Sequence, residues 1–79
     1  MKKQDHNIIP RNATRIVAEQ IGEMSAGRPG DVWECWKDKD CGGWHGVNRS
    51  ANDGKQYWMF TAHLRIRELY RFIEVEKGA

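Results

Sequence analysis

Aromatic residues crowd the middle of this chain, and each group of them is bounded by residues that favour turns. The segment 31–36 (DVWECW) follows a Pro-Gly pair and precedes a polar run, which is typical of a β-strand. The segments 44–48 (WHGVN) and 56–60 (QYWMF) are set off by Gly-Gly and by Asn-Asp-Gly. The pattern predicts three short antiparallel strands.

The segments on either side of these strands have apolar residues at helical spacing. From Asn12, a residue suited to an N-cap, the spacing predicts a helix up to Met24, with Gly27 as its stop. Thr61 precedes a second such segment, whose apolar stripe consists of Ala62, Ile66, Leu69, Tyr70 and Ile73. The predicted fold class is therefore α+β: a small two-layer sandwich of helix, three-stranded antiparallel sheet and helix.

The length of 79 residues is enough for one domain. Residues 1–10 are polar up to a short apolar stretch before Pro10, so we expect a flexible N-terminal arm followed by a single domain over 11–79. No apolar run approaches the roughly 20 residues of a membrane-spanning helix, and the basic start leads into polar residues instead of a signal-peptide core. We expect a cytoplasmic protein that does not contact membranes.

The two cysteines are too few for the disulfide framework of a small secreted domain. Cys35, Cys41 and His45, with His63 or His6 as a fourth member, have the chemistry of zinc ligands. Zinc modules normally present closely spaced pairs, whereas five residues separate the two cysteines here. We expect Cys35 to be buried in its strand and Cys41 to be exposed in a loop, with no metal and no cofactor.

Strand alternation divides the aromatic residues between the two faces of the sheet. Trp33 and Trp36 point to opposite faces, as do Tyr57 and Trp58. If the helices cover one face, the other presents exposed rings, and such surfaces are enriched at protein interfaces and base-stacking sites. Trp36, Trp44 and Tyr57 are the candidate binding residues among the aromatics.

Basic residues gather on the predicted second helix. His63, Arg65, Arg67 and Arg71 lie there, joined by Lys55 from the preceding turn, and arginine is suited to bidentate contact with phosphate or carboxylate. The same residues can also form a solvated face that nearby glutamates partly neutralise, because Glu68 and Glu74 each lie three residues from an arginine.

Two observations bear on catalysis. Cys41 and His45 are close in sequence, but no third residue is placed to orient the histidine. The predicted order of elements resembles the double-stranded-RNA-binding fold and, within it, the HicA family of small toxin ribonucleases, whose glycine-x-histidine motif is matched by residues 43–45 (GWH). Trp44 stands where that family favours a small hydroxyl residue, so no catalytic role is assigned to His45.

These features favour a small non-enzymatic binding protein, of the kind that phages and mobile elements encode. It would dock its aromatic and arginine-bearing surface on a host protein or nucleoprotein complex, as an inhibitor or regulator. A net charge of +2 is too small for a protein that coats nucleic acid by charge alone. One alternative is DNA or RNA binding through the sheet and the second helix, and another is a HicA-like ribonuclease.

Overall fold

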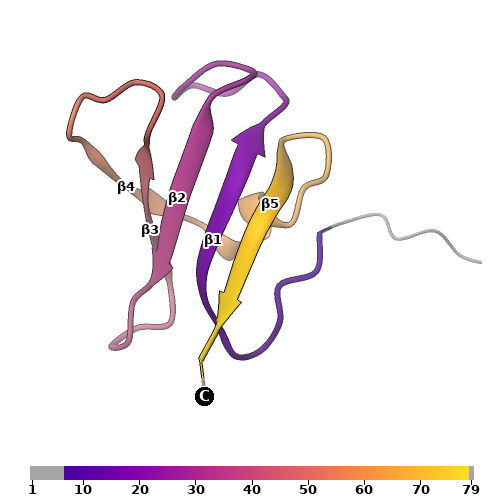
Figure 1. Ribbon diagram of the computed structural model, residues 1–79, viewed down its shortest axis with the longest axis vertical. Coiled ribbons are helices and arrows are strands. Elements are labelled where there is room, and N and C mark those ends of the chain that lie inside the picture. Colours follow the sequence, from indigo (N-terminus) through magenta and orange to yellow (C-terminus); the bar gives the residue numbers. More distant parts are fainter. Residues whose placement is uncertain (1–6, 79) are drawn as a thin grey trace, which may run out of the picture.

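Residues 7–78 are described by the computed structural model, and they form a five-stranded antiparallel sheet with one short helix (Figure 1). The elements are β1 (Ala13–Gln20), β2 (Val32–Lys37), β3 (Trp44–Asn48), β4 (Gln56–Met59), α1 (Thr61–Leu64) and β5 (Tyr70–Lys77). The strand order in the sheet is β4-β3-β2-β1-β5. The first four strands form a meander, and β5 returns to the far side of β1, at the edge opposite β4.

The expected sandwich of helix, three strands and helix is wrong. The first predicted helix is instead strand β1, in which the β-branched residues Thr14, Ile16 and Val17 favour an extended backbone. β1 pairs with β2 on one side and with β5 on the other, so its backbone groups are satisfied by two neighbours. Pairing on both sides outweighs the helical spacing of its apolar residues.

The second predicted helix is also wrong, because only α1 is helical and the chain continues as strand β5. In β5 the side chains of Tyr70 and Phe72 are covered, whereas Arg71 is exposed. A register shift opposite Val17 and Ala18 then moves the alternation of covered and exposed side chains by one residue. Val75 is therefore the next half-buried position. Of the predicted stripe, Tyr70 is buried and Ile73 is exposed, so these positions do not form one face of a helix.

The three predicted strands in the middle of the chain are confirmed as β2, β3 and β4. The turn between β2 and β3 contains Gly42 with a φ of 74°, and the turn between β3 and β4 contains Gly54 with a φ of 71°. Both values lie in the left-handed region that glycine tolerates. The turn residues therefore identified these strand ends in the sequence.

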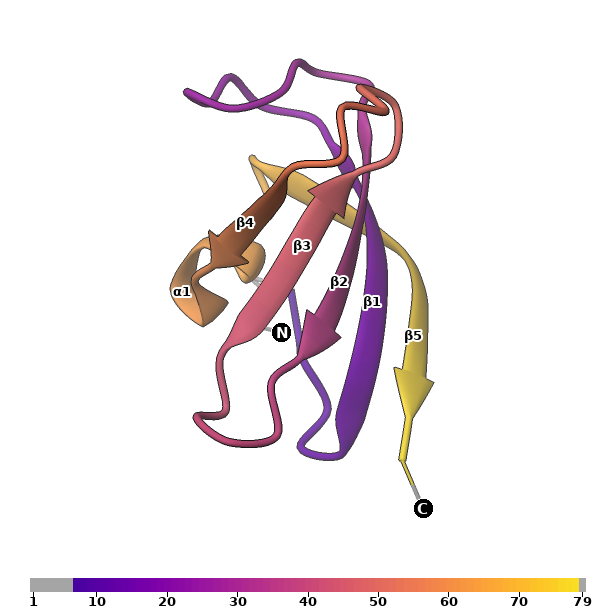
Figure 2. The ribbon, with the colours of Figure 1, turned by 90° about the vertical axis from the view of Figure 1, so that its left-hand side faces the viewer.

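The core lies on the face of the sheet that α1 covers (Figure 2). It is made of Ala13, Ile16, Ala18, Trp33, Cys35, Trp44, Met59, Leu64 and Tyr70. α1 contributes Leu64, whose side chain is fully buried. Two tryptophans and a tyrosine thus fill much of an interior to which few large aliphatic residues contribute.

A buried hydrogen bond fixes Trp33 within this core. The Nε1 of Trp33 donates to the Oε1 of Gln20 at 3.0 Å, and the Nε2 of Gln20 donates to the backbone oxygen of Gly22 at 2.9 Å. Throughout residues 7–78, no fully buried side-chain nitrogen or oxygen lacks a partner. The polar atoms inside the core are therefore satisfied.

The expected arm over residues 1–10 is described only from Asn7 onward, and residues 1–6 lie outside the described part. Asn7 donates from its backbone nitrogen to Arg65 at 2.7 Å, and from its side chain to the backbone oxygens of Leu64 at 3.1 Å and Tyr70 at 2.9 Å. These bonds attach the chain at Asn7 to the segment that joins α1 to β5. Within 7–78, no helix has the length and apolar character needed to cross a membrane.

Candidate functional site

Three aromatic side chains form a row across the face of the sheet that points away from the core. The strand register places Trp36 opposite His45, and His45 opposite Trp58. Directly opposed residues in an antiparallel pair share a face, and alternation within β2 and β3 puts this face opposite to that of Trp33 and Trp44. We call Trp36, His45 and Trp58 the aromatic row.

The aromatic row is open to solvent, and two of its three rings are in contact. Trp36 is 39% exposed and Trp58 is 47% exposed, although tryptophan is highly buried on average. The rings of His45 and Trp58 meet edge to face, with centroids 4.6 Å apart and planes at 77°. Exposed aromatic rings of this kind are typical of a binding surface.

The turn between β2 and β3 holds the central ring of the row. The Nε2 of His45 lies 2.8 Å from the Oδ2 of Asp38, and Asp38 also accepts a hydrogen bond from the backbone nitrogen of Asp40 at 2.8 Å. The hydrogen bond with His45 is the main cause that lowers the pKa of Asp38 below its ordinary value. His45 is thus fixed between a carboxylate and a tryptophan ring.

Gly43 supports the outer end of the row. A Cβ atom at this position would lie 2.7 Å from the Cζ2 of Trp58, which is closer than real Cβ atoms approach. The Trp58 ring therefore lies against a bare stretch of backbone. A side chain larger than glycine at this position would displace the Trp58 ring.

The charged residues of the same face are paired with one another. Arg15, which lies opposite Trp36 in the register, is the centre of the largest group. The ion pairs are Arg15 with Glu34, Glu74 and Glu76, Arg49 with Glu34, and Arg71 with Glu19. Each of these guanidinium groups already has a carboxylate within 3.1 Å, so phosphate would have to displace that partner.

The aromatic residues predicted as binding residues lie on opposite faces of the sheet. Trp36 is exposed in the aromatic row, as alternation predicts. Trp44 is 2% exposed and belongs to the core. Tyr57 is half-buried on the core side, where its ring packs edge to face on Trp33 at a centroid distance of 5.2 Å. Of these three side chains, only Trp36 belongs to the row.

The predicted basic residues do not share a helix face, because only Thr61–Leu64 of the predicted second helix is helical. His63 lies in α1, with its ring 5.7 Å from that of Phe60. Arg65 and Arg67 are exposed in the segment after α1, and Arg71 is in β5. Lys55, the fifth of these residues, is exposed just before β4. The helical surface on which their grouping depended is absent from the described chain.

Sequence reasoning missed two members of the row. The alternation of 44–48 placed His45 opposite in direction to Trp44, and that of 56–60 placed Trp58 opposite to Tyr57. The signal that was lacking is the register, because turn lengths alone did not fix which residues stand opposite Trp36.

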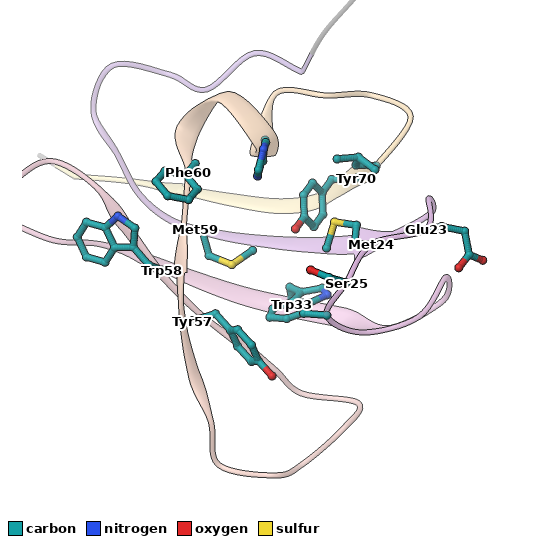
Figure 3. Close-up of a pocket in the computed structure, with 12 residues that line it drawn as sticks. Glu23, Met24, Ser25, Trp33, Tyr57, Trp58, Met59, Phe60 and Tyr70 are labelled. Atoms are coloured by element: carbon teal, nitrogen blue, oxygen red, sulfur yellow. The ribbon is translucent and has the colours of Figure 1, made fainter.

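A cavity of about 370 Å³ lies on the other side of the molecule, where the sheet faces α1 (Figure 3). Its apolar lining includes Met24, Trp33, Tyr57, Met59, Phe60 and Tyr70. Burial raises the pKa of the Tyr70 hydroxyl to about 12, so this group is neutral over the physiological range. The cavity has the size and the mainly apolar walls of a site for a small molecule.

The cysteines lie as expected, with Cys35 buried in β2 and Cys41 exposed in the following turn. Burial raises the pKa of the Cys35 thiol to about 12, which keeps it protonated and unreactive. Over residues 7–78, no cluster of three or more histidine, cysteine or acidic side chains could hold a metal ion. His6, once weighed as a fourth ligand, lies outside the described residues.

No protein-family model, curated protein or solved structure matches this chain. The resemblance to the HicA ribonucleases depended on an order of helix, strands and helix that the protein does not have. His45 is held by Asp38 beside Trp58. The aromatic row and the cavity are therefore the features that bear on function.

Proposed function

We propose that this protein is a non-enzymatic binding protein that docks its aromatic row onto a protein or nucleoprotein partner. The observation that supports this most is the pair of exposed tryptophans, Trp36 and Trp58, on one face of a sheet whose core already contains two others. A chain that fills its core with aromatic rings has no structural need for two more in water. In this proposal the protein acts in the cytoplasm and inhibits or regulates its partner.

The proposal is supported by the fixed geometry of the row. Trp58 is held by His45 and by the bare backbone at Gly43, and His45 is held by Asp38. Rings that are already fixed before binding lose little side-chain entropy when the partner arrives. Tryptophan is also among the residues most enriched at interface positions that contribute large binding energies.

The charges of the same face favour a protein partner over nucleic acid. Arg15, Arg49 and Arg71 are each paired with glutamate, so this face offers alternating charges instead of a basic stripe. Protein interfaces commonly combine aromatic centres with a mixed polar rim. Nucleic-acid binding remains the second candidate only through stacking of bases on the exposed tryptophans.

Site-specific crosslinking in cells tests the proposal. A photoreactive phenylalanine analogue is placed at Trp36 or Trp58, and at Ile73 as the control, because Ile73 is an apolar residue in β5 that is 51% exposed and outside the row. We expect both row positions to crosslink to the same partner protein, and Ile73 not to do so. Crosslinking of the row positions to nucleic acid would favour the second candidate function, nucleic-acid binding. Equal capture of one protein from all three positions would contradict docking through the row.

A further inference from the structure

The cavity between the sheet and α1 is walled by aromatic rings from two directions. Trp33 and Tyr57 contribute one pair from the sheet, with centroids 5.2 Å apart. Phe60 and His63 contribute a second pair from the start of α1, with centroids 5.7 Å apart. Tyr70 adds a further ring, and Figure 3 shows these side chains gathered around one central space. Trp58 of the aromatic row also contributes to the lining, whereas Trp36 and His45 do not.

The charge of the lining selects among ligands. Glu23 is the only carboxylate among the described residues that line the cavity, and neither lysine nor arginine lines it. Figure 3 places Glu23 at the edge of the group of lining side chains, with its carboxylate turned away from the rings. Aromatic faces carry negative electrostatic potential, so rings and carboxylate together attract a cation and repel an anion.

The two methionines and the Tyr70 hydroxyl offer further contacts to such a cation. Met24 and Met59 provide flexible apolar walls that adapt to the shape of a hydrocarbon body. Figure 3 shows the Tyr70 hydroxyl pointing into the space between these two methionines. A neutral hydroxyl in this position accepts a hydrogen bond from an ammonium N–H.

We propose that this cavity binds a small organic amine, namely a cationic ammonium group attached to an aryl or alkyl body. The apolar body packs against the rings and methionines, and the ammonium group lies over the aromatic faces toward Glu23. A volume of about 370 Å³ accommodates a ring with a short chain. This site lies on the core side of the sheet, so it can be occupied without blocking Trp36 in the aromatic row.

A matched set of three ligands tests the charge preference. 2-Phenylethylamine, 2-phenylethanol and 3-phenylpropanoate have similar bodies but are cationic, neutral and anionic, and each is titrated into the full chain while backbone amide shifts are recorded by NMR. We expect the amine to saturate shifts around Tyr57 and Met24, with affinity about tenfold above that of the carboxylate and a few-fold above that of the alcohol. Equal or weaker binding of the amine would overturn the proposal, as would the lack of any saturable shift.

Variants assign the effect to the cavity. Phe60 is 58% exposed, so Phe60→Ala is expected to retain the fold and to weaken amine binding about fivefold. Glu23→Gln is expected to narrow the difference between amine and carboxylate while leaving the alcohol unchanged. Trp36→Ala is the control, because it alters the aromatic row and not the cavity. If Phe60→Ala and Glu23→Gln both bind the three ligands like the parent, the cavity is not the site, whatever the outcome for the aromatic row.

Discussion

The ring of Trp58 meets the ring of His45 edge to face, with 4.6 Å between centroids and 77° between planes. These residues stand opposite each other in β4 and β3, so the register of the sheet creates the contact. An edge-to-face pair contributes about 0.5 to 1.5 kcal/mol beyond area burial, which is enough to favour one orientation of an exposed ring. The contact therefore favours one orientation of the exposed Trp58 side chain.

Gly43→Ala is expected to displace the Trp58 ring from His45, because the new Cβ would lie 2.7 Å from the Cζ2 of that ring. The ring is exposed and can move, so the melting temperature should fall only slightly. The measurement is the NMR shift of the His45 ring protons, which loses the ring-current contribution of Trp58. The control is the same substitution in a Trp58→Ala background, where no displacement is possible. Unchanged His45 shifts in the single variant would contradict the packing described.

Asp38 is expected to titrate below its ordinary value near 3.8, because its hydrogen bond with His45 lowers its pKa. A carboxyl group with a lowered pKa in the folded state stabilises the fold above its ordinary pKa, and that contribution is lost as pH falls through the lowered pKa. His45→Phe keeps an aromatic ring beside Trp58 but removes the hydrogen bond. It should raise the pKa of Asp38 toward the ordinary value, as measured by NMR of the side-chain carboxyl carbon. The same Asp38 pKa in both proteins would be inconsistent with the bond.

The strands that could be predicted from the sequence are those that turn residues bound on either side. β2, β3 and β4 are short, aromatic and bounded by residues such as Gly42 and Gly54, which adopt positive φ. No residue with a positive φ lies next to the ends of β1 or β5 in the described chain. Their identity depends on pairing between residues more than 50 positions apart, as between Val17 and Glu74, and local periodicity does not report such pairing.

The proposed binding surface could be predicted only in part, for a related reason. Alternation within β2 is a local property, and it correctly placed Trp36 on the face opposite Trp33. Which neighbours stand beside Trp36 depends on the register between strands, so His45 and Trp58 were not identified as its companions. The basic residues were predicted to share a helix face, but that segment divides into α1, a connecting segment and β5, so they do not share one.

Cys41 is expected to react with a thiol reagent at once in the folded protein, whereas Cys35 should react only on unfolding. Burial raises the pKa of Cys35 from 9.0 to about 12, so above pH 9 the unfolded chain releases this proton more readily and stability should decrease. The measurement is the number of thiols labelled rapidly at pH 8, expected to be one in the parent and none in Cys41→Ser. A second rapidly labelled thiol would show that Cys35 is accessible to solvent and that its side chain is not buried in the core.

Leu64→Ala is expected to lower the free energy of unfolding by about 2 to 5 kcal/mol, the range for truncating a buried aliphatic side chain. Leu64 is fully buried although it belongs to a helix of only four residues, so its packing is what attaches α1 to the sheet. Ile73→Ala is the control, because this side chain is half exposed and its loss should change stability by less than about 0.5 kcal/mol. Denaturant melts that rank the two variants equally would show that α1 is not part of the core.

The dissociation constant for the partner captured through the row is the most direct test of the account. It is measured for the parent, Trp36→Ala, Trp58→Ala and Ile73→Ala, after circular dichroism has shown that each variant is folded. Truncation of an interface tryptophan typically costs about 2 kcal/mol or more, so each row variant should bind roughly thirtyfold more weakly, while Ile73→Ala binds like the parent. Normal affinity in folded Trp36→Ala and Trp58→Ala would contradict the claim that the aromatic row is the binding surface.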